Sequence, residues 1–194
     1  VTIDGLRFVN DATTTGGGDE GSTLSVSTAG HGVVNSIFWS AVNGAANAAQ
    51  DRAIFFYGIA SGTVEITGNY FTGAFAQGFS GGSWGPGIWF NGGGVALEVT
   101  GNTFEYTRTA LNLDMGGTSS AIVEGNIFRT AGTAVSVGFS ADNVTLADND
   151  FINVGGDLNL RNVTDGIVLD AAEAVDIVTP AGPLDLFQIR GGAF

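Results

Sequence analysis

The sequence LEVTGNTF at residues 97–104 is the best guide to the fold, because near copies of it recur along most of the chain. Clear copies stand at 64–71 (VEITGNYF), 121–128 (AIVEGNIF) and 144–151 (VTLADNDF), and degenerate copies at 1–8 (VTIDGLRF) and 31–38 (HGVVNSIF). Within each copy apolar residues alternate with polar ones, which is typical of a strand with one buried face and excludes a helix. The final Phe recurs after 30, 33, 33, 24 and 23 residues, so the short spacings predict a bare coil and the long ones a coil with an insertion.

The Gly-Asn pair before the Phe predicts a corner. Glycine accepts a positive φ without steric cost, and asparagine hydrogen-bonds nearby backbone groups. If the coils stack in register about 4.8 Å apart, the amides form one ladder and the phenyl rings form another in the core. The expected amide ladder is Asn69, Asn102, Asn126 and Asn149, and the expected ring ladder is Phe71, Phe104, Phe128 and Phe151.

A second strand-like segment precedes each later copy, at 23–26, 53–56, 87–90, 110–113 and 134–137. Each coil is therefore expected to carry at least two strands. The tail from 156 keeps some alternation but loses the Phe corner, and the segment 184–189 is expected to add an edge strand or to cover the last coil. The prediction is a single all-β domain over 1–194, with regular coils at 1–155 and irregular coils and a closing segment at 156–194.

The repeated I-x-G-N-x-F pattern resembles the repeats of the right-handed parallel β-helix superfamily. That superfamily includes polysaccharide lyases, some glycoside hydrolases and many bacterial surface proteins. The resemblance covers roughly 1–155 and implies a right-handed parallel β-helix solenoid of about six or seven coils. It is almost silent on function, because a fold does not imply a chemistry.

The amino-acid composition limits the classes of molecule that the protein is expected to bind. The 194 residues carry a formal net charge of -13 with six arginines, no lysine and no cysteine. That charge repels nucleic acid and anionic lipid, so neither is expected as a partner, whereas a neutral glycan, a protein surface or a divalent cation meets no such barrier. No apolar run approaches the roughly 20 residues that span a bilayer, so membrane insertion is not expected.

The repeat aligns a row of outward-facing residues on the first strand of each coil. We expect Phe55 and Trp89 to be neighbours there, with Asn112 continuing the row and with Tyr57 and Trp84 close by. Aromatic faces beside polar groups suit sugar rings or a protein partner. The alternative is that Trp84, Tyr57 and the loop 73–86 fold over the patch and cover it.

The second strand places acidic residues outward, and Glu65 and Glu98 align as neighbours with Glu124 one pleat later. Paired carboxylates serve glycoside hydrolysis and also bind calcium, so these three residues are the candidate metal ligands. The alternative is a solvated acidic face that keeps the solenoid soluble. No cofactor is required by this pattern, and calcium is the candidate ion.

A polysaccharide lyase needs a base and a group that neutralises the substrate carboxyl. The sequence has no lysine, and His31 aligns with the inward Val64, which favours a packed or capping histidine. Arg52 and Arg108 lie near strand starts without a basic cluster. We therefore expect a non-catalytic module of an extracellular or cell-surface bacterial protein, used as a stalk, fibre or glycan-contacting element. A polysaccharide lyase or glycosidase that uses the surface carboxylates is the alternative.

Residues 1–8 already show the pattern of a strand that faces the core, and such a strand at the end of a solenoid offers unpaired backbone groups to another strand. We therefore expect either that the chain is part of a longer solenoid or that copies of it stack head to tail.

Overall fold

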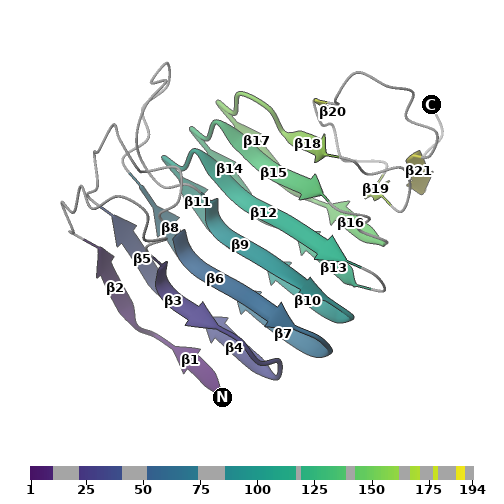
Figure 1. Ribbon diagram of the computed structural model, residues 1–194. Coiled ribbons are helices and arrows are strands. Elements are labelled where there is room, and N and C mark those ends of the chain that lie inside the picture. The colour runs from purple at the N-terminus through teal and green to yellow at the C-terminus, as the bar shows by residue number, and fades with distance from the viewer. Residues whose placement is uncertain are drawn as a thin grey trace.

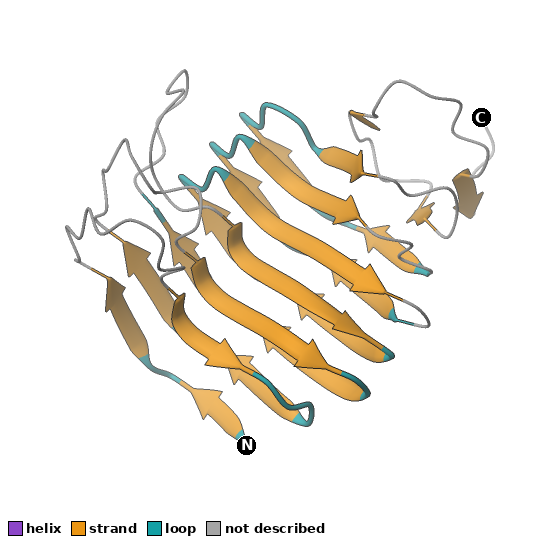
Figure 2. Ribbon diagram, in the orientation of Figure 1, coloured by secondary structure: helices purple, strands orange, loops and turns teal. Residues whose placement is uncertain are grey.

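A computed structural model describes residues 1–10, 22–40, 52–73, 86–116, 119–138, 143–161, 167–170, 177–178 and 187–190. Every regular element in these ranges is a strand, and the strands form three sheets in which every pairing given is parallel (Figure 2). The strands follow one another as coils that stack from the N-terminus to the C-terminus (Figure 1). This architecture is that of a parallel β-helix of about six coils, as the repeat predicts.

Sheet A has eight strands and contains the strand that precedes the Gly-Asn corner in each repeat copy. Their order is β1 (Thr2–Asp4), β4 (His31–Val34), β7 (Gly62–Thr67), β10 (Val95–Thr100), β13 (Ser120–Glu124), β16 (Val144–Ala147), β19 (Ile167–Asp170) and β21 (Phe187–Arg190). The last of these pairs with β19 in parallel, so the closing segment does add an edge strand.

Sheet B begins immediately after the Gly-Asn corner and carries the repeated Phe. Its six strands are β17 (Asp150–Ile152), β14 (Ile127–Arg129), β11 (Thr103–Glu105), β8 (Tyr70–Thr72), β5 (Ile37–Ser40) and β2 (Arg7–Asn10). The sequence predicts only a corner at these residues. The structure gives a third strand because the corner needs just two residues, which leaves the Phe and its neighbours extended.

Sheet C contains the second strand-like segments. Its seven strands are β20 (Ile177–Val178), β18 (Leu158–Arg161), β15 (Thr133–Gly138), β12 (Thr109–Gly116), β9 (Pro86–Gly93), β6 (Arg52–Ile59) and β3 (Ser22–Val26). Each of β6, β9 and β12 has eight residues, which makes this the face with the longest strands among those described.

The ring ladder is confirmed. Six phenyl rings stack in successive coils, with centroids 4.6–5.4 Å apart and planes within 5–13° of parallel. They are Phe8, Phe38, Phe71, Phe104, Phe128 and Phe151. The four inner rings are at most 1% exposed and belong to the hydrophobic core, whereas the end rings Phe8 and Phe151 are only partly buried and pack against it.

The amide ladder is also confirmed. The Oδ1 atom of Asn102 accepts from the backbone N–H of Asn69 at 2.9 Å and from its Nδ2 at 3.0 Å, and Asn126 and Asn149 repeat the arrangement. The corner itself needs a positive φ, which is 63° at Gly101. Asp148 replaces glycine in the last clear copy and adopts 53°, because a short polar side chain tolerates this region.

Candidate functional site: a cleft on the outer face of sheet C

The outer face of sheet C carries the predicted aromatic row. Phe55 pairs with Trp89, and Trp89 pairs with Asn112, on adjacent strands β6, β9 and β12. The ring centroids of Phe55 and Trp89 are 5.3 Å apart. The in-register stacking that the repeat predicts therefore brings these three residues together.

Arg52 changes what the aromatic row can do. Its side chain is fully buried, and its guanidinium carbon lies 4.2 Å from the centroid of the Phe55 ring and 3.8 Å from that of Trp89. A cation over a ring face is attracted by the ring quadrupole. One face of each ring is thus occupied from within the protein, so Phe55 and Trp89 form a support more than a platform for a sugar. The same burial removes Arg52 as a group that could neutralise a substrate carboxyl.

A second row lies two residues further along the same strands. Tyr57 pairs with Asn91, and Asn91 pairs with Asp114. Tyr57 is 61% exposed, whereas the Asp114 side chain is almost buried. Three successive coils therefore present a phenol ring, an amide and a carboxylate in a line, at the strand spacing of about 4.8 Å.

A β-bulge adjoins this second row. The register between β6 and β9 shifts between Tyr57 and Ile59, and the intervening Gly58 has a φ of 69°. Bulges bend a strand and turn its side chains, and they occur often beside binding sites. The solenoid is thus irregular at the residue that carries the exposed ring.

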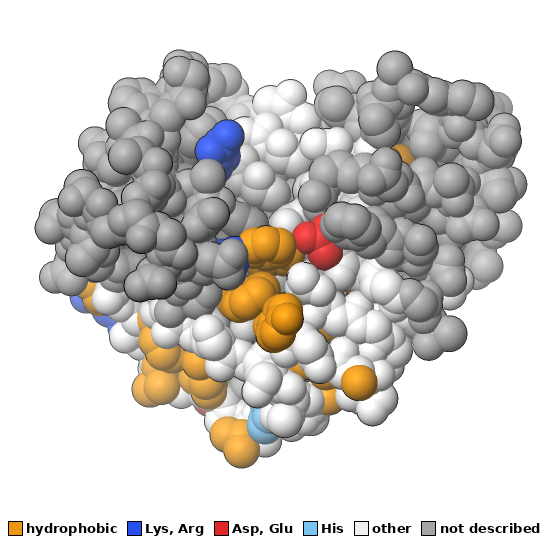
Figure 3. Space-filling view, viewed as in Figure 1, with side chains coloured by type: hydrophobic (Ala, Val, Ile, Leu, Met, Phe, Trp, Pro, Cys, Tyr) orange, Lys and Arg blue, Asp and Glu red, His pale blue; other side chains and the backbone are white. Residues whose placement is uncertain are grey.

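The second row borders a cleft of about 630 Å³, which is in the size range of small-molecule sites. The described residues that line it are Tyr57, Gly58, Ile59, Ala60, Asn91, Gly92, Gly93, Asp114 and Gly116. The cleft lies where the carboxyl ends of β6, β9 and β12 meet at one edge of sheet C. Figure 3 shows this face, with hydrophobic side chains gathered next to an acidic group. A Cβ at Gly92 would lie 2.7 Å from the carbonyl oxygen of Ile59, so close backbone packing requires the glycine there.

Asp114 is held by its neighbours. Its Oδ2 accepts from the indole Nε1–H of Trp89 at 2.7 Å and from Nδ2 of Asn112 at 3.3 Å. The repeat alignment places Asp114 beside Asn91 but does not predict these hydrogen bonds, because they depend on side-chain directions across strands. The remaining predicted residue of this site, Trp84, lies outside the described residues.

The predicted metal ligands are only partly brought together. Glu65 and Glu98 are direct partners on β7 and β10, and both are exposed. Glu124 pairs with Thr100 instead, so it is displaced by one coil and two residues from Glu98. Within the described ranges, no three acidic or histidine side chains are grouped in a way that could hold a metal ion.

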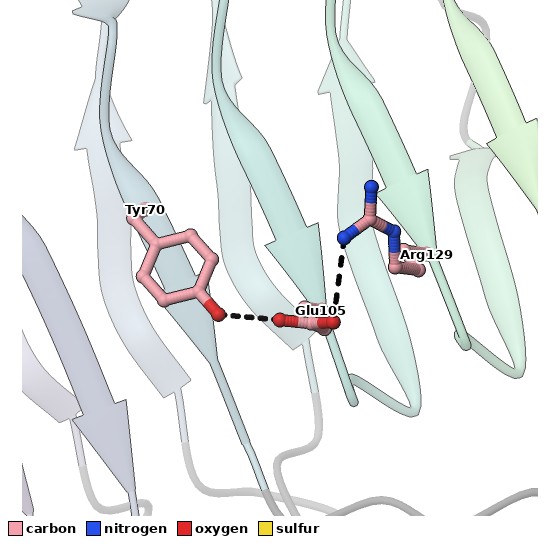
Figure 4. A network of polar contacts seen from close by, with 3 residues as sticks. All are labelled: Tyr70, Glu105 and Arg129. Atoms are coloured by element: carbon pink, nitrogen blue, oxygen red, sulfur yellow. Dashed lines mark hydrogen bonds and ion pairs between the residues drawn. The ribbon is translucent and has the colours of Figure 1, made fainter.

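A polar network that the sequence does not predict lies on the outer face of sheet B (Figure 4). The Tyr70 hydroxyl donates to Oε2 of Glu105, and Oε1 of Glu105 lies 3.7 Å from a guanidinium nitrogen of Arg129. Burial and this hydrogen bond raise the pKa of Tyr70 above its usual value of 10.0. A phenol with a raised pKa is a poorer base at neutral pH, which disfavours Tyr70 as the proton-abstracting group of a lyase.

Comparison of the sequence and the structure with protein families, curated proteins and solved structures gives no match. The described part of the chain contains no helix with the length and apolar character needed to cross a membrane.

Proposed function

We propose that the chain is a non-catalytic, glycan-contacting module of an extracellular or cell-surface bacterial protein, which binds its ligand in the cleft on sheet C. We further propose that it is one domain and belongs to the right-handed parallel β-helix superfamily that its repeat resembles. A right-handed coil is the general rule, because about 98% of parallel crossover connections have that hand.

The exposed Tyr57 ring at the edge of the cleft is the observation that carries the proposal. It is 61% exposed, it lies 5.5 Å from the Phe55 ring, and its strand partner Asn91 has an amide that both donates and accepts. An aromatic platform beside an amide and a carboxylate matches a sugar, which has an apolar C–H face and a rim of hydroxyl groups. The net charge of -13 favours a neutral glycan over an acidic one.

The arrangement of the carboxylates supports binding over catalysis. Among the described residues that line the cleft, Asp114 is the one carboxylate. Glycoside hydrolysis uses a pair about 5–10 Å apart. Glu65 and Glu98 do form a pair, but they project from sheet A and are not among the described residues that line the cleft.

Calorimetric titration with hexaoses of β-1,4-glucan, β-1,3-glucan, α-1,4-glucan and β-1,4-mannan tests the proposal. We expect at least one to bind, and Tyr57→Ala to weaken it about 10-fold, as the loss of an aromatic contact does. Tyr106→Ala is the matched control, because Tyr106 is also exposed, at 41%, but lies at the end of β11 outside the cleft lining.

The same samples distinguish a binding module from an enzyme. We expect no new reducing ends and no unsaturated product after prolonged incubation. Product formation that Asp114→Asn or Glu98→Gln abolishes would replace the binding module with a polysaccharide-active enzyme. If none of the hexaoses binds, the glycan proposal fails, and a protein partner takes its place as the candidate ligand.

A further inference from the structure

Two contacts link a buried cation to the carboxylate of the cleft. The Arg52 guanidinium lies 3.8 Å over the Trp89 ring, the Trp89 indole N–H donates to Oδ2 of Asp114 at 2.7 Å, and Asp114 lines the cleft. Arg52 itself is 0% exposed and is not among the described residues that line the cleft, so it acts on a ligand indirectly, and Trp89 is the neighbour that connects it to Asp114.

From this geometry we infer that Asp114 is the specificity-determining group of the cleft, selecting a ligand that offers a hydroxyl donor, and that Arg52 is the residue that positions it. The inference rests on the proposed glycan site and adds to it the ligand group that the site recognises.

The role of Asp114 follows from its chemistry. An ionised carboxylate only accepts hydrogen bonds, and bonds to it are about twice as strong as those between neutral groups. A site built around such a group disfavours an analogue that lacks the donor, because the carboxylate then gives up hydration on binding and gains no new hydrogen bond in exchange. A hydroxyl group can donate an additional hydrogen bond to the Asp114 carboxylate, whereas a methyl ether at the same position only accepts and cannot.

The role of Arg52 follows from its burial and its planarity. The guanidinium lies over the rings of both Phe55 and Trp89, so it limits the rotation of the Trp89 indole. The N–H of that indole donates to Asp114. Asn112 donates to the same oxygen at 3.3 Å, which fixes the carboxylate from a second direction. A binding group held by packed neighbours keeps its selectivity, and one that is loosely held loses it.

Two ligand probes of equal length and linkage test the selectivity: the hexaose that binds in the panel above, and the same hexaose fully O-methylated. O-methylation keeps the apolar ring face but removes every hydroxyl donor. We expect the wild type to prefer the free hexaose by about 100-fold or more. We expect Arg52→Met and Asp114→Asn each to reduce that preference about 10-fold. We expect Arg52→Lys to retain more of the preference than Arg52→Met, because the ammonium keeps a cation near the rings but lacks the planar guanidinium group.

A readout without ligand keeps the positioning role testable on its own. In a protein with ¹⁵N-labelled tryptophan, we expect the indole N–H signal of Trp89, assigned through Trp89→Phe, to shift in Arg52→Met and in Asp114→Asn. Arg129→Met is the matched control, because that arginine lies on sheet B and contacts Glu105 instead. Thermal melting checks that each variant is folded. If Arg52→Met does not fold, the Trp89 indole signal is measured in Arg52→Lys instead.

The outcomes separate the two claims. A folded Arg52→Met protein with an unchanged Trp89 indole signal overturns the positioning role, whether or not any glycan binds. An unchanged preference for the free hexaose in Asp114→Asn overturns the selectivity claim while the glycan site stands. If no hexaose binds to the wild type, the proposed function and the selectivity fail together, and only the indole shift then reports on Arg52.

Discussion

Replacing Asn126 by leucine removes the central link of the amide ladder while keeping the number and branching of the side-chain heavy atoms. Asn126 is fully buried, and its Oδ1 accepts from the backbone N–H of Asn102 at 2.9 Å and from its Nδ2 at 3.0 Å. Its own Nδ2 donates to the carbonyl oxygen of Val99 at 2.9 Å and to Oδ1 of Asn149 at 3.0 Å. The variant loses all four contacts.

The magnitude follows from the groups left behind. The backbone N–H of Asn102 and the carbonyl of Val99 each lose this partner, and a buried polar group without a partner costs about 1–3 kcal/mol. The expected loss of unfolding free energy in Asn126→Leu is therefore about 2–6 kcal/mol, a large share of the roughly 5–15 kcal/mol of a typical domain.

Serine at the same position is the matched comparison, because the chain already uses it. Ser36 takes the place of the asparagine in the second coil, where its Oγ accepts from the backbone N–H of Leu6 at 3.2 Å and donates to the carbonyl of Val34 at 2.9 Å. Asn126→Ser should thus retain part of the corner and lose roughly half as much stability as Asn126→Leu.

Urea unfolding followed by circular dichroism measures both variants, with an unchanged slope showing that the same surface is exposed. An Asn126→Leu protein whose unfolding free energy is within about 0.5 kcal/mol of the wild-type value, or a serine variant as unstable as the leucine variant, would contradict a stabilising amide ladder.

Three further predictions concern the core, the acidic pair and sheet B. Phe104→Ala should lower the unfolding free energy by about 3–5 kcal/mol and Phe104→Leu by clearly less, as urea titration would show; equal losses would contradict a stacked ring at this position. Of the three predicted metal ligands only Glu65 and Glu98 are direct strand partners, so we expect millimolar calcium to leave the melting temperature unchanged. A rise in melting temperature that chelator reverses and Glu65→Gln abolishes would instead establish a calcium site. The raised pKa of Tyr70 means that the folded state holds this proton more tightly than the unfolded chain, so its contribution to stability is full below pH 10.0 and is lost as the pH rises above it. Melting temperatures from pH 9 to about 11.5 should therefore fall less steeply in Tyr70→Phe than in the wild type, and parallel curves would show that the bond to Glu105 has no such effect.

The repeat predicts the ladders and the facing of each strand because coils stack in register. In a parallel solenoid, residues at the same position of successive repeats become direct neighbours, so the alignment of Phe71 with Phe104 in the sequence is already a statement about contact in space. The same rule places Phe55 beside Trp89 and Glu65 beside Glu98. These contacts needed no knowledge of the tertiary structure.

The cleft depends on places where the structure departs from the regular repeat, and an alignment of the repeats does not predict them. The bulge at Gly58 shifts the register between Tyr57 and Ile59, and the sequence shows only one more glycine in a glycine-rich chain. Arg52 begins its strand at a position that the alternation marks as inward, yet its long side chain reaches the outward rings of Phe55 and Trp89.

The repeated spacing is thus enough to predict which residues stack on which, because combined with parallel register it leaves one set of neighbours. The tertiary structure alone decided which of those neighbours are available to a ligand. Exposure of Tyr57, enclosure of Arg52 and orientation of Asp114 depend on side-chain directions across three coils. Those directions are set by local packing, for which the repeat carries no signal.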